Sequence, residues 1–160
     1  MANREILLKS LEFMPLTREG EKQGVEIYKY SFNHLPAMMP FYHLAEGFTG
    51  DSAITSDRFQ KLGYKLSLAV HLMANIADQP DTLKAYAREQ VLRHISRKVS
   101  PRLFRSFFDV LTDWMATKTE ITAEMRKEWA NLADIYSNEA VSYADELGLV
   151  FEENGPPKGA

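Results

Sequence analysis

Helical periodicity runs through almost the whole chain, and no other feature constrains the fold more. Apolar residues recur at spacings of three and four, whereas the strict alternation that marks a half-buried strand is scarce. Pro36, Pro40 and Pro80 interrupt this pattern and so divide it into separate helices. The pattern predicts an all-α fold with six main helices and short connectors. The helices are expected at about residues 3–15, 17–34, 55–77, 81–97, 101–115 and 122–147, with a turn-like helix at 36–42 and a loop at 46–52.

Several of the expected helix ends carry capping signals. Asn3 and Asp81 are residue types that favour the N-cap, and Pro101 suits a first helical position. Gly148 suits the end of the last helix, because glycine tolerates the left-handed backbone found there. We therefore expect one domain over residues 1–150, followed by a disordered tail at 151–160 that is rich in proline and glycine.

Composition excludes several classes of function. The net charge of −3 comes without a clustered basic patch, so nucleic acid is not an expected partner. No apolar run approaches the roughly 20 residues that cross a bilayer, and the N-terminal residues show no apolar signal core, so we expect a cytoplasmic protein without a membrane partner. The chain has no cysteine, which excludes disulfides and thiolate metal sites.

The four histidines are therefore the only nitrogen ligands for a transition metal. His34 and His43 are separated by a proline turn, and His71 and His94 fall on different predicted helices, so a multi-histidine zinc site is not favoured. The sequence also lacks a Gly-rich phosphate loop and a nucleophile elbow. Taken alone, a single helical histidine is usually a surface or packed residue.

The setting of His94 is nevertheless suggestive. It precedes a basic stretch that includes Arg97 and Lys98. A neutral imidazole is a good iron ligand, and nearby cations can pair with carboxylates such as haem propionates.

The order and spacing of several residues resemble the globin family over about residues 3–150. Pro36 matches the proline that opens the short third globin helix. Tyr28, eight residues earlier, falls where globins place a ligand-facing residue, and Tyr42, six residues later, where they place the aromatic side chain that stacks on haem. His94 matches the proximal histidine.

Other matches extend the resemblance. Gly24 and Gly63 fall where globins let two helices cross closely, and Pro101 matches the proline that opens the seventh globin helix. The segments at 59–63 and 88–94 look most like those of nematode globins of the intracellular, myoglobin-like kind.

The resemblance implies a globin fold around a haem pocket, with haem b as cofactor and His94 as the iron ligand. Glu89, Gln90 or a main-chain carbonyl one turn before His94 could bind the other ring nitrogen. His43 is expected to be exposed, with an approach to a propionate as the alternative, and His71 is expected on the outer face of its helix.

On the opposite haem face, Tyr28 is the expected hydrogen-bond donor to the ligand; the alternative is a core tyrosine with its hydroxyl bound to the main chain. Leu62 takes the distal position, where globins usually carry histidine or glutamine. Leucine can neither donate nor ligate, so the resemblance implies five-coordinate iron. Lys65 is an alternative donor, although a surface lysine near a propionate is favoured.

Tyr42 is a second departure, because the family position is nearly always phenylalanine. Its hydroxyl needs a polar partner, and Phe41 could take the stacking role if the turn shifts by one residue. Leu66 and Phe108 are candidate pocket walls, although ordinary core positions would look the same.

The function implied is reversible binding of oxygen, or of another diatomic gas, for storage or transport. An enzyme role in nitric oxide dioxygenation or peroxide chemistry ranks lower, because it would need an external reductase and because Leu62 removes an acid–base group. A haem-based gas or redox sensor and a haem-free helical interaction module are the remaining alternatives, and a homodimer is left open.

Overall fold

The computed structural model describes residues 1–151, apart from the side chain of Glu21. The tail predicted at 151–160 thus lies outside the described residues, except for its first residue. The described part is entirely helical, which confirms the all-α prediction. Its elements are α1 (Arg4–Ser10), α2 (Arg18–His34), the 3₁₀ helix η1 (Pro36–Tyr42), α3 (Gly50–Ile54), α4 (Asp57–Asn75), α5 (Pro80–His94), the 3₁₀ helix η2 (Ile95–Arg97), α6 (Arg102–Ala116) and α7 (Ala123–Glu146).

Side-chain caps begin several helices where the sequence places them. The Asn3 amide oxygen accepts from the main-chain N–H groups of Glu5 and Ile6 at 3.1 and 3.3 Å. Thr122 caps α7 in the same way through Met125 N–H at 3.1 Å. Such bonds satisfy N–H groups that have no partner within the helix, and each contributes about 1 kcal/mol.

Three predicted boundaries were wrong. Residues 46–52 are not all loop, because α3 begins at Gly50, where Thr49 and Ser52 form a reciprocal capping box. The first helix ends at Ser10 instead of near Pro15. Asp81 does not cap α5, since Pro80 already occupies the first turn and Asp81 lies within it.

Two glycines allow α2 and α4 to cross in backbone contact. A Cβ atom on Gly24 would lie 1.9 Å from the Gly63 carbonyl oxygen, and a Cβ atom on Gly63 would lie 2.4 Å from the Val25 nitrogen. These obstructing atoms belong to the main chain and cannot rotate away. The crossing predicted from these two positions is therefore confirmed.

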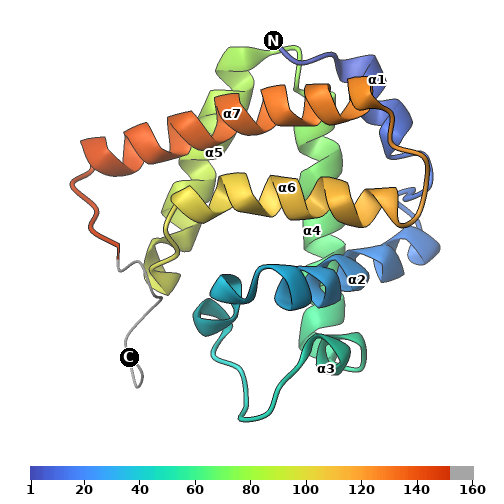
Figure 1. Cartoon of the computed structure of the whole chain (residues 1–160). Helices are drawn as coiled ribbons and strands as arrows, with labels where there is room; N and C mark the ends of the chain where they lie inside the picture. Colours follow the sequence, from blue (N-terminus) through green and yellow to red (C-terminus); the bar gives the residue numbers. More distant parts are fainter. Residues whose placement is uncertain (152–160) are drawn as a thin grey trace.

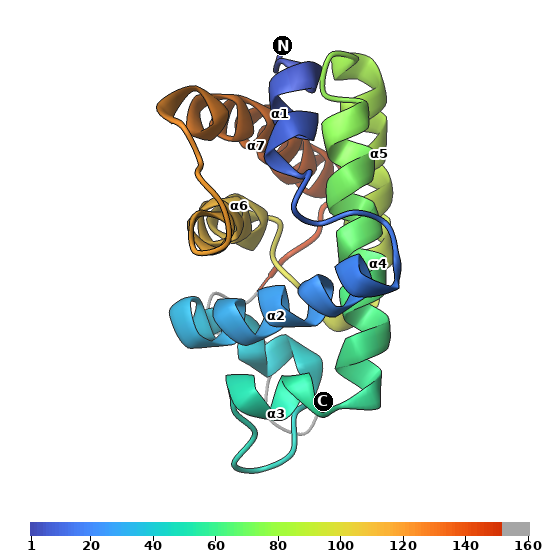
Figure 2. The same ribbon diagram turned by 90° about the vertical axis from the view of Figure 1, so that its right-hand side faces the viewer.

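The helices form two layers around a large core. In Figure 1, α6 and α7 run side by side in front of α4 and α5, and Figure 2 shows the same separation from the side. Between the layers lies the main core, which joins α1 and α2 to α4, α5, α6 and α7. Its largest fully buried members are Trp114, Trp129, Leu7, Leu11, Met14, Ile27, Leu83, Leu111, Met115 and Leu132.

A second, smaller group of side chains lies beneath α2, where α2, η1, α3 and α4 meet. We call it the aromatic cluster, and it consists of Tyr28, Phe32, Tyr42, Phe48 and Phe59. The rings meet mostly edge-on or tilted, at centroid distances of 5.3 to 6.3 Å. Edge-to-face pairs add about 0.5–1.5 kcal/mol beyond the burial of apolar area. Among the described residues, no helix has the length and apolar character needed to cross a membrane.

Candidate functional site

A cavity opens between the two layers, at the place where the main core meets the aromatic cluster. It contains about 870 Å³ of empty space, part of which is continuous with solvent. Ligand pockets in proteins are lined mainly by apolar side chains. The lining residues here come from α2, η1, α4, α5, η2, α6 and α7, and most of them are apolar or aromatic.

His94 enters this cavity from the last turn of α5. Leu83, Ala87 and Val91 follow one another at intervals of four and are buried, so they anchor one face of the helix in the main core. His94 comes three residues after Val91 and therefore points to the same side, where it joins the cavity lining.

The two ring nitrogens of His94 have different surroundings. Nδ1 lies 2.7 Å from the main-chain carbonyl oxygen of Gln90, one turn earlier. Because a carbonyl can only accept, Nδ1 carries the proton and Nε2 keeps its lone pair. The side chain of Glu89 pairs instead with Arg93 at 2.7 Å. Of the three candidate partners considered from the sequence, the structure selects the carbonyl.

Burial lowers the pKa of His94 below its ordinary value, and the positive charges of Arg97 and Arg93 act in the same direction. The hydrogen bond to Gln90 acts in the opposite direction without reversing the shift. The imidazole is therefore neutral at neutral pH, which is the form that binds a metal.

Aromatic rings surround His94 on the main-core side of the cavity. Phe104 meets the imidazole edge-on at 5.5 Å, and Tyr136 lies 5.8 Å beyond Phe104. Tyr136 is 6% exposed, and burial strongly raises the pKa of its phenol. On this side of the cavity, packed aromatic rings therefore surround the His94 imidazole, whose Nε2 is unprotonated.

Two phenols define the side of the cavity that borders the aromatic cluster. Tyr28 on α2 and Tyr42 at the end of η1 both line the cavity, and their rings meet edge-on at 5.7 Å. Burial raises the pKa of Tyr28 well above its ordinary value, and the neighbouring Tyr42 adds to this. Burial also raises the pKa of Tyr42. Both phenols therefore stay protonated and able to donate at neutral pH.

The remaining predicted site residues divide into two groups. Phe41, Leu66 and Phe108 line the cavity together with Tyr42, so both candidates for the stacking ring are present. Leu62 does not line it and packs, half-buried, against the aromatic cluster. Lys65 is exposed on α4 and also lies outside the lining.

The other three histidines do not reach the cavity. His43 is exposed, as expected, and His34 stacks on Tyr30 at 3.8 Å. The expectation that His71 lies on the outer face of α4 was wrong. Its Nε2 lies 2.6 Å from the Met14 carbonyl oxygen, so it faces the connection between α1 and α2. This contact joins residues 57 positions apart, and for that reason no local pattern could reveal it.

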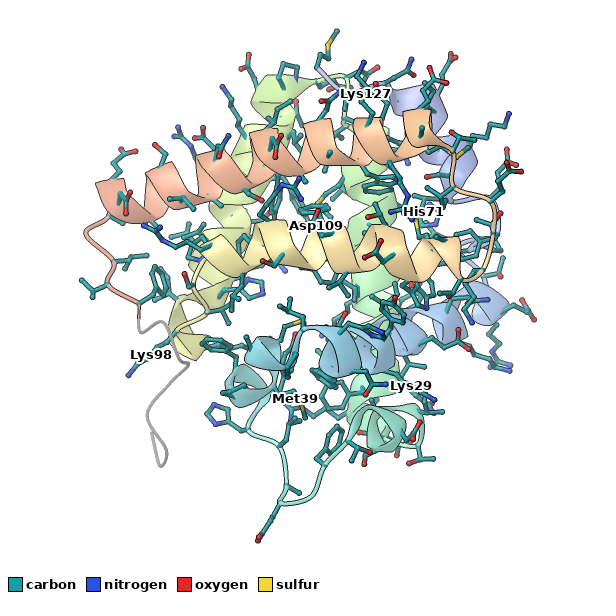
Figure 3. All side chains as sticks on the ribbon, viewed as in Figure 1. Lys29, Met39, His71, Lys98, Asp109 and Lys127 are labelled. Carbon is teal, nitrogen blue, oxygen red and sulfur yellow. The ribbon has the colours of Figure 1, made fainter. Side chains whose placement is uncertain are left out.

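Several lining residues were not singled out as site residues from the sequence. Tyr86 and Tyr136 carry phenols, and both follow the helical spacing of ordinary core positions. Arg97 was noticed only as part of a basic stretch, and it lines the cavity as the first cation after His94. Lys98, next in the chain, has a left-handed backbone and points outward (Figure 3). The missed residues that also line the cavity are Met38, Ala69, Met73, Val99, Leu103, Phe104 and Phe107.

Comparison with known proteins places this arrangement in a family. The family model described as Globin matches residues 25–139. A myoglobin of Nippostrongylus brasiliensis is 32% identical over 143 residues, which cover 89% of this chain and 93% of the relative. A cuticular globin isoform of the same worm is 32% identical over 144 residues, which cover 89% of this chain and 83% of the relative.

A solved structure gives the same result. The structure of a globin-like protein of Caenorhabditis elegans superimposes with a TM-score of 0.86 and is 27% identical in sequence. The match covers 93% of this chain and 96% of that protein. The fold, the cavity histidine and these matches lead to one conclusion: the chain belongs to the globin family.

Proposed function

We propose that residues 1–150 form a domain that holds one haem b through His94 Nε2 and reversibly binds oxygen for storage or transport. The observation that carries the proposal is the neutral imidazole in the cavity, with Nδ1 fixed on the Gln90 carbonyl 2.7 Å away and Nε2 left to coordinate. Haem iron supplies the coordination position at which a diatomic gas binds.

The cavity residues fit such a group. The lining is mostly apolar and aromatic, as a flat macrocycle requires, and either Tyr42 or Phe41 can contact its face. Arg97 can pair with a carboxylate at the solvent-continuous side, since a guanidinium forms the strongest contacts with such groups.

The chain's own residues also suggest how the ligand is held. Tyr28 is a buried phenol that lines the cavity, and its raised pKa keeps the proton available for donation at neutral pH. Within the described residues, His94 is the only histidine that lines the cavity, and Leu62 offers no donor or metal ligand. We therefore expect five-coordinate iron without ligand, and Tyr28 as the donor to bound gas.

Titration of the purified chain with haem, followed by visible absorbance, tests the assignment of His94. The wild-type chain should saturate with one haem per chain, and His94→Ala should lose tight binding while keeping its helical far-UV signal. His34→Ala is the matched control, because His34 is exposed and lies outside the cavity. Equal haem affinity in wild type and His94→Ala would contradict the proposal.

A further inference from the structure

The outer face of α4 carries large apolar side chains that no other part of the described structure covers. Tyr64, Leu68 and Leu72 are 45%, 49% and 41% exposed, and they follow one another at intervals of four residues. Side chains at this spacing lie in one line along a helix, and we call these three the outer stripe. Single exposed leucines are common on protein surfaces, whereas a continuous apolar line points to a contact surface.

The outer stripe lies opposite the face through which α4 is held in the fold. That buried face includes Phe59, Gly63, Val70 and Met73, which pack toward α2 and the main core. Because helical positions advance by about 100° per residue, the stripe points away from this face. In Figure 2, α4 stands on the side of the molecule turned away from α6. The packing of a single chain therefore gives the outer stripe no partner.

Charge is distributed unevenly along α4 and the connection that follows it. Residues 56–65 hold three exposed cations and one carboxylate, whereas residues 66–83 hold two exposed carboxylates and no lysine or arginine. The cations are Arg58, Lys61 and Lys65, and the two carboxylates are those of Asp78 and Asp81. Within the described part of the chain, none of these five side chains forms an ion pair.

One cation from another helix also reaches the C-terminal end of α4. Arg4 of α1 donates to the main-chain and side-chain oxygens of Asn75 at 2.9 and 3.0 Å. It offsets only part of the negative charge of Asp78 and Asp81. The outer stripe is thus bordered by positive charge at its N-terminal end and by negative charge beyond its C-terminal end.

We propose that the outer stripe binds a second copy of this chain, which packs antiparallel on it about a two-fold axis at Leu68. Leu68 then meets its own counterpart, and Tyr64 of each copy meets Leu72 of the other, as an isologous contact requires. The charges select this direction. Antiparallel packing brings the cationic half of each α4 toward the acidic end of the other, whereas parallel packing would set like charges side by side.

The length of the stripe sets the strength that we expect. The helix rises by only about 12 Å between Tyr64 and Leu72. Stable dimers bury about 800 Å² on each partner, and contacts of less than about 600 Å² on each partner are weak and transient. One helix face of this length, with its bordering charges, belongs to the second class. We therefore expect a reversible dimer with a dissociation constant of about 10–500 µM at low salt.

Sedimentation equilibrium of the full chain between about 10 µM and 1 mM tests this association. The wild type should pass from monomer toward dimer, and Leu68→Lys should weaken the dimer at least about tenfold, because two ammonium groups would meet at the axis. Leu147→Lys is the matched control, since Leu147 is 43% exposed but lies at the end of α7. A wild type that stays monomeric at the highest concentration would overturn the proposal. If that monomer binds phosphatidylcholine–phosphatidylserine vesicles and Leu68→Lys does not, the stripe is a lipid-binding surface instead.

Charge reversal tests the antiparallel direction. Lys61→Glu combined with Lys65→Glu should weaken the dimer at low salt, and so should Asp78→Lys combined with Asp81→Lys, because each double variant sets like charges against each other. An equimolar mixture of the two double variants should regain the association of the wild type, since in a mixed pair each end faces the opposite charge. A mixture that associates no better than either variant alone would overturn the antiparallel pairing.

The absence of cysteine from the chain makes the contact directly measurable. Leu68→Cys introduces a single thiol at the axis, and mild oxidation should join two copies there, because bridged Cα atoms must lie within about 7 Å of each other. Tyr64→Cys should pair with Leu72→Cys faster than with itself, and Leu147→Cys gives the rate of random collision. Equal rates for Leu68→Cys and Leu147→Cys would refute the pairing. They would leave the proposed function untouched, since no bound ligand enters this measurement.

Discussion

The main core and the aromatic cluster meet at one cavity but are built differently. In the main core, helices far apart in the sequence pack through many aliphatic side chains together with buried rings such as Trp114, Trp129, Phe108 and Tyr136. One of its polar contacts is the 2.9 Å bond from Trp129 Nε1 to Ser10 Oγ. The aromatic cluster gathers five rings from a shorter stretch, and two of the five carry hydroxyls. The first region can fix a metal ligand on a rigid helix, whereas the second can present proton donors.

This difference explains the division of roles across the cavity. His94 sits at the end of a helix whose buried face belongs to the main core, so its position follows from that core. Tyr28 and Tyr42 depend on two phenylalanines and on the close crossing of α2 and α4. Changes in one region should therefore affect haem retention, and changes in the other should affect ligand retention.

The largest effect is expected where α2 and α4 cross. Gly63→Ala would place a methyl group 2.4 Å from the main-chain nitrogen of Val25, and the two helices would have to separate. We expect a loss of about 3 kcal/mol in the free energy of unfolding, measured by urea denaturation. The control is Gly148→Ala, where a Cβ meets nothing within 4 Å and only the left-handed backbone is strained, at about 1–2 kcal/mol. A Gly63→Ala variant as stable as the control would mean that the crossing is looser than described.

Removal of a single hydroxyl should separate the two sides of the cavity. Tyr28→Phe should accelerate oxygen dissociation by about one to two orders of magnitude, the equivalent of about 1.5–3 kcal/mol. Tyr136→Phe removes an equally buried phenol beside the histidine and should change the rate less than twofold, because that phenol belongs to the main core. Stopped-flow measurement of the oxygen dissociation rate checks this. Equal acceleration in Tyr28→Phe and Tyr136→Phe would show that the two sides of the cavity do not differ in their contact with the ligand.

Alkaline pH should destabilise the fold through its buried phenols, which lie on both sides of the cavity. Burial raises the folded-state pKa of Tyr28, Tyr42 and Tyr136, so stability is complete below the unfolded pKa of about 10 and is lost as pH rises above it. One pH unit above that value should cost up to about 1.4 kcal/mol for each phenol that stays neutral in the fold. Urea midpoints between pH 9 and 11 check this, and Tyr28→Phe should flatten the dependence. An unchanged slope would show that this phenol ionises freely in the folded chain.

The smallest effect is expected at the exposed edge of the cavity. Arg97 lines the cavity but is solvent-exposed, so its ion pair with a haem carboxylate should contribute at most about 1 kcal/mol. Arg97→Gln should therefore accelerate haem transfer to an acceptor protein by no more than about fivefold, and added salt should reduce the difference. A hundredfold change in the rate of haem transfer would show that Arg97 forms a buried contact with the haem instead of an exposed ion pair.

Local patterns predicted the helices and the anchor points of this fold well. The cap at Asn3, the start of the last helix at Thr122 and the close crossing at Gly24 and Gly63 were predicted from residue type and spacing, and the structure agrees with all three. The short helix α3 was missed because Gly47 and Gly50 favoured a loop, although Thr49 and Ser52 form a capping box at its start.

Tertiary contacts account for the features that the sequence did not predict. Nothing local distinguishes Tyr136 from an ordinary core residue of α7, and only the packed structure places it in the cavity. The contact of His71 with Met14 depends in the same way on how α1 and α2 are joined. The contact between the Tyr28 and Tyr42 rings could not be predicted from their separation of fourteen residues, because η1 must first fold back on α2.

The visible absorption spectrum of the reduced, haem-loaded chain, recorded without and then with oxygen, tests the central claim most directly. We expect one broad visible band without oxygen that splits into two when oxygen is admitted and returns when oxygen is removed, as five-coordinate iron held by His94 alone requires. Two sharp bands already present without oxygen would reveal a sixth ligand from the protein. That result would contradict the proposal, because His94 is the only histidine among the described residues that line the cavity.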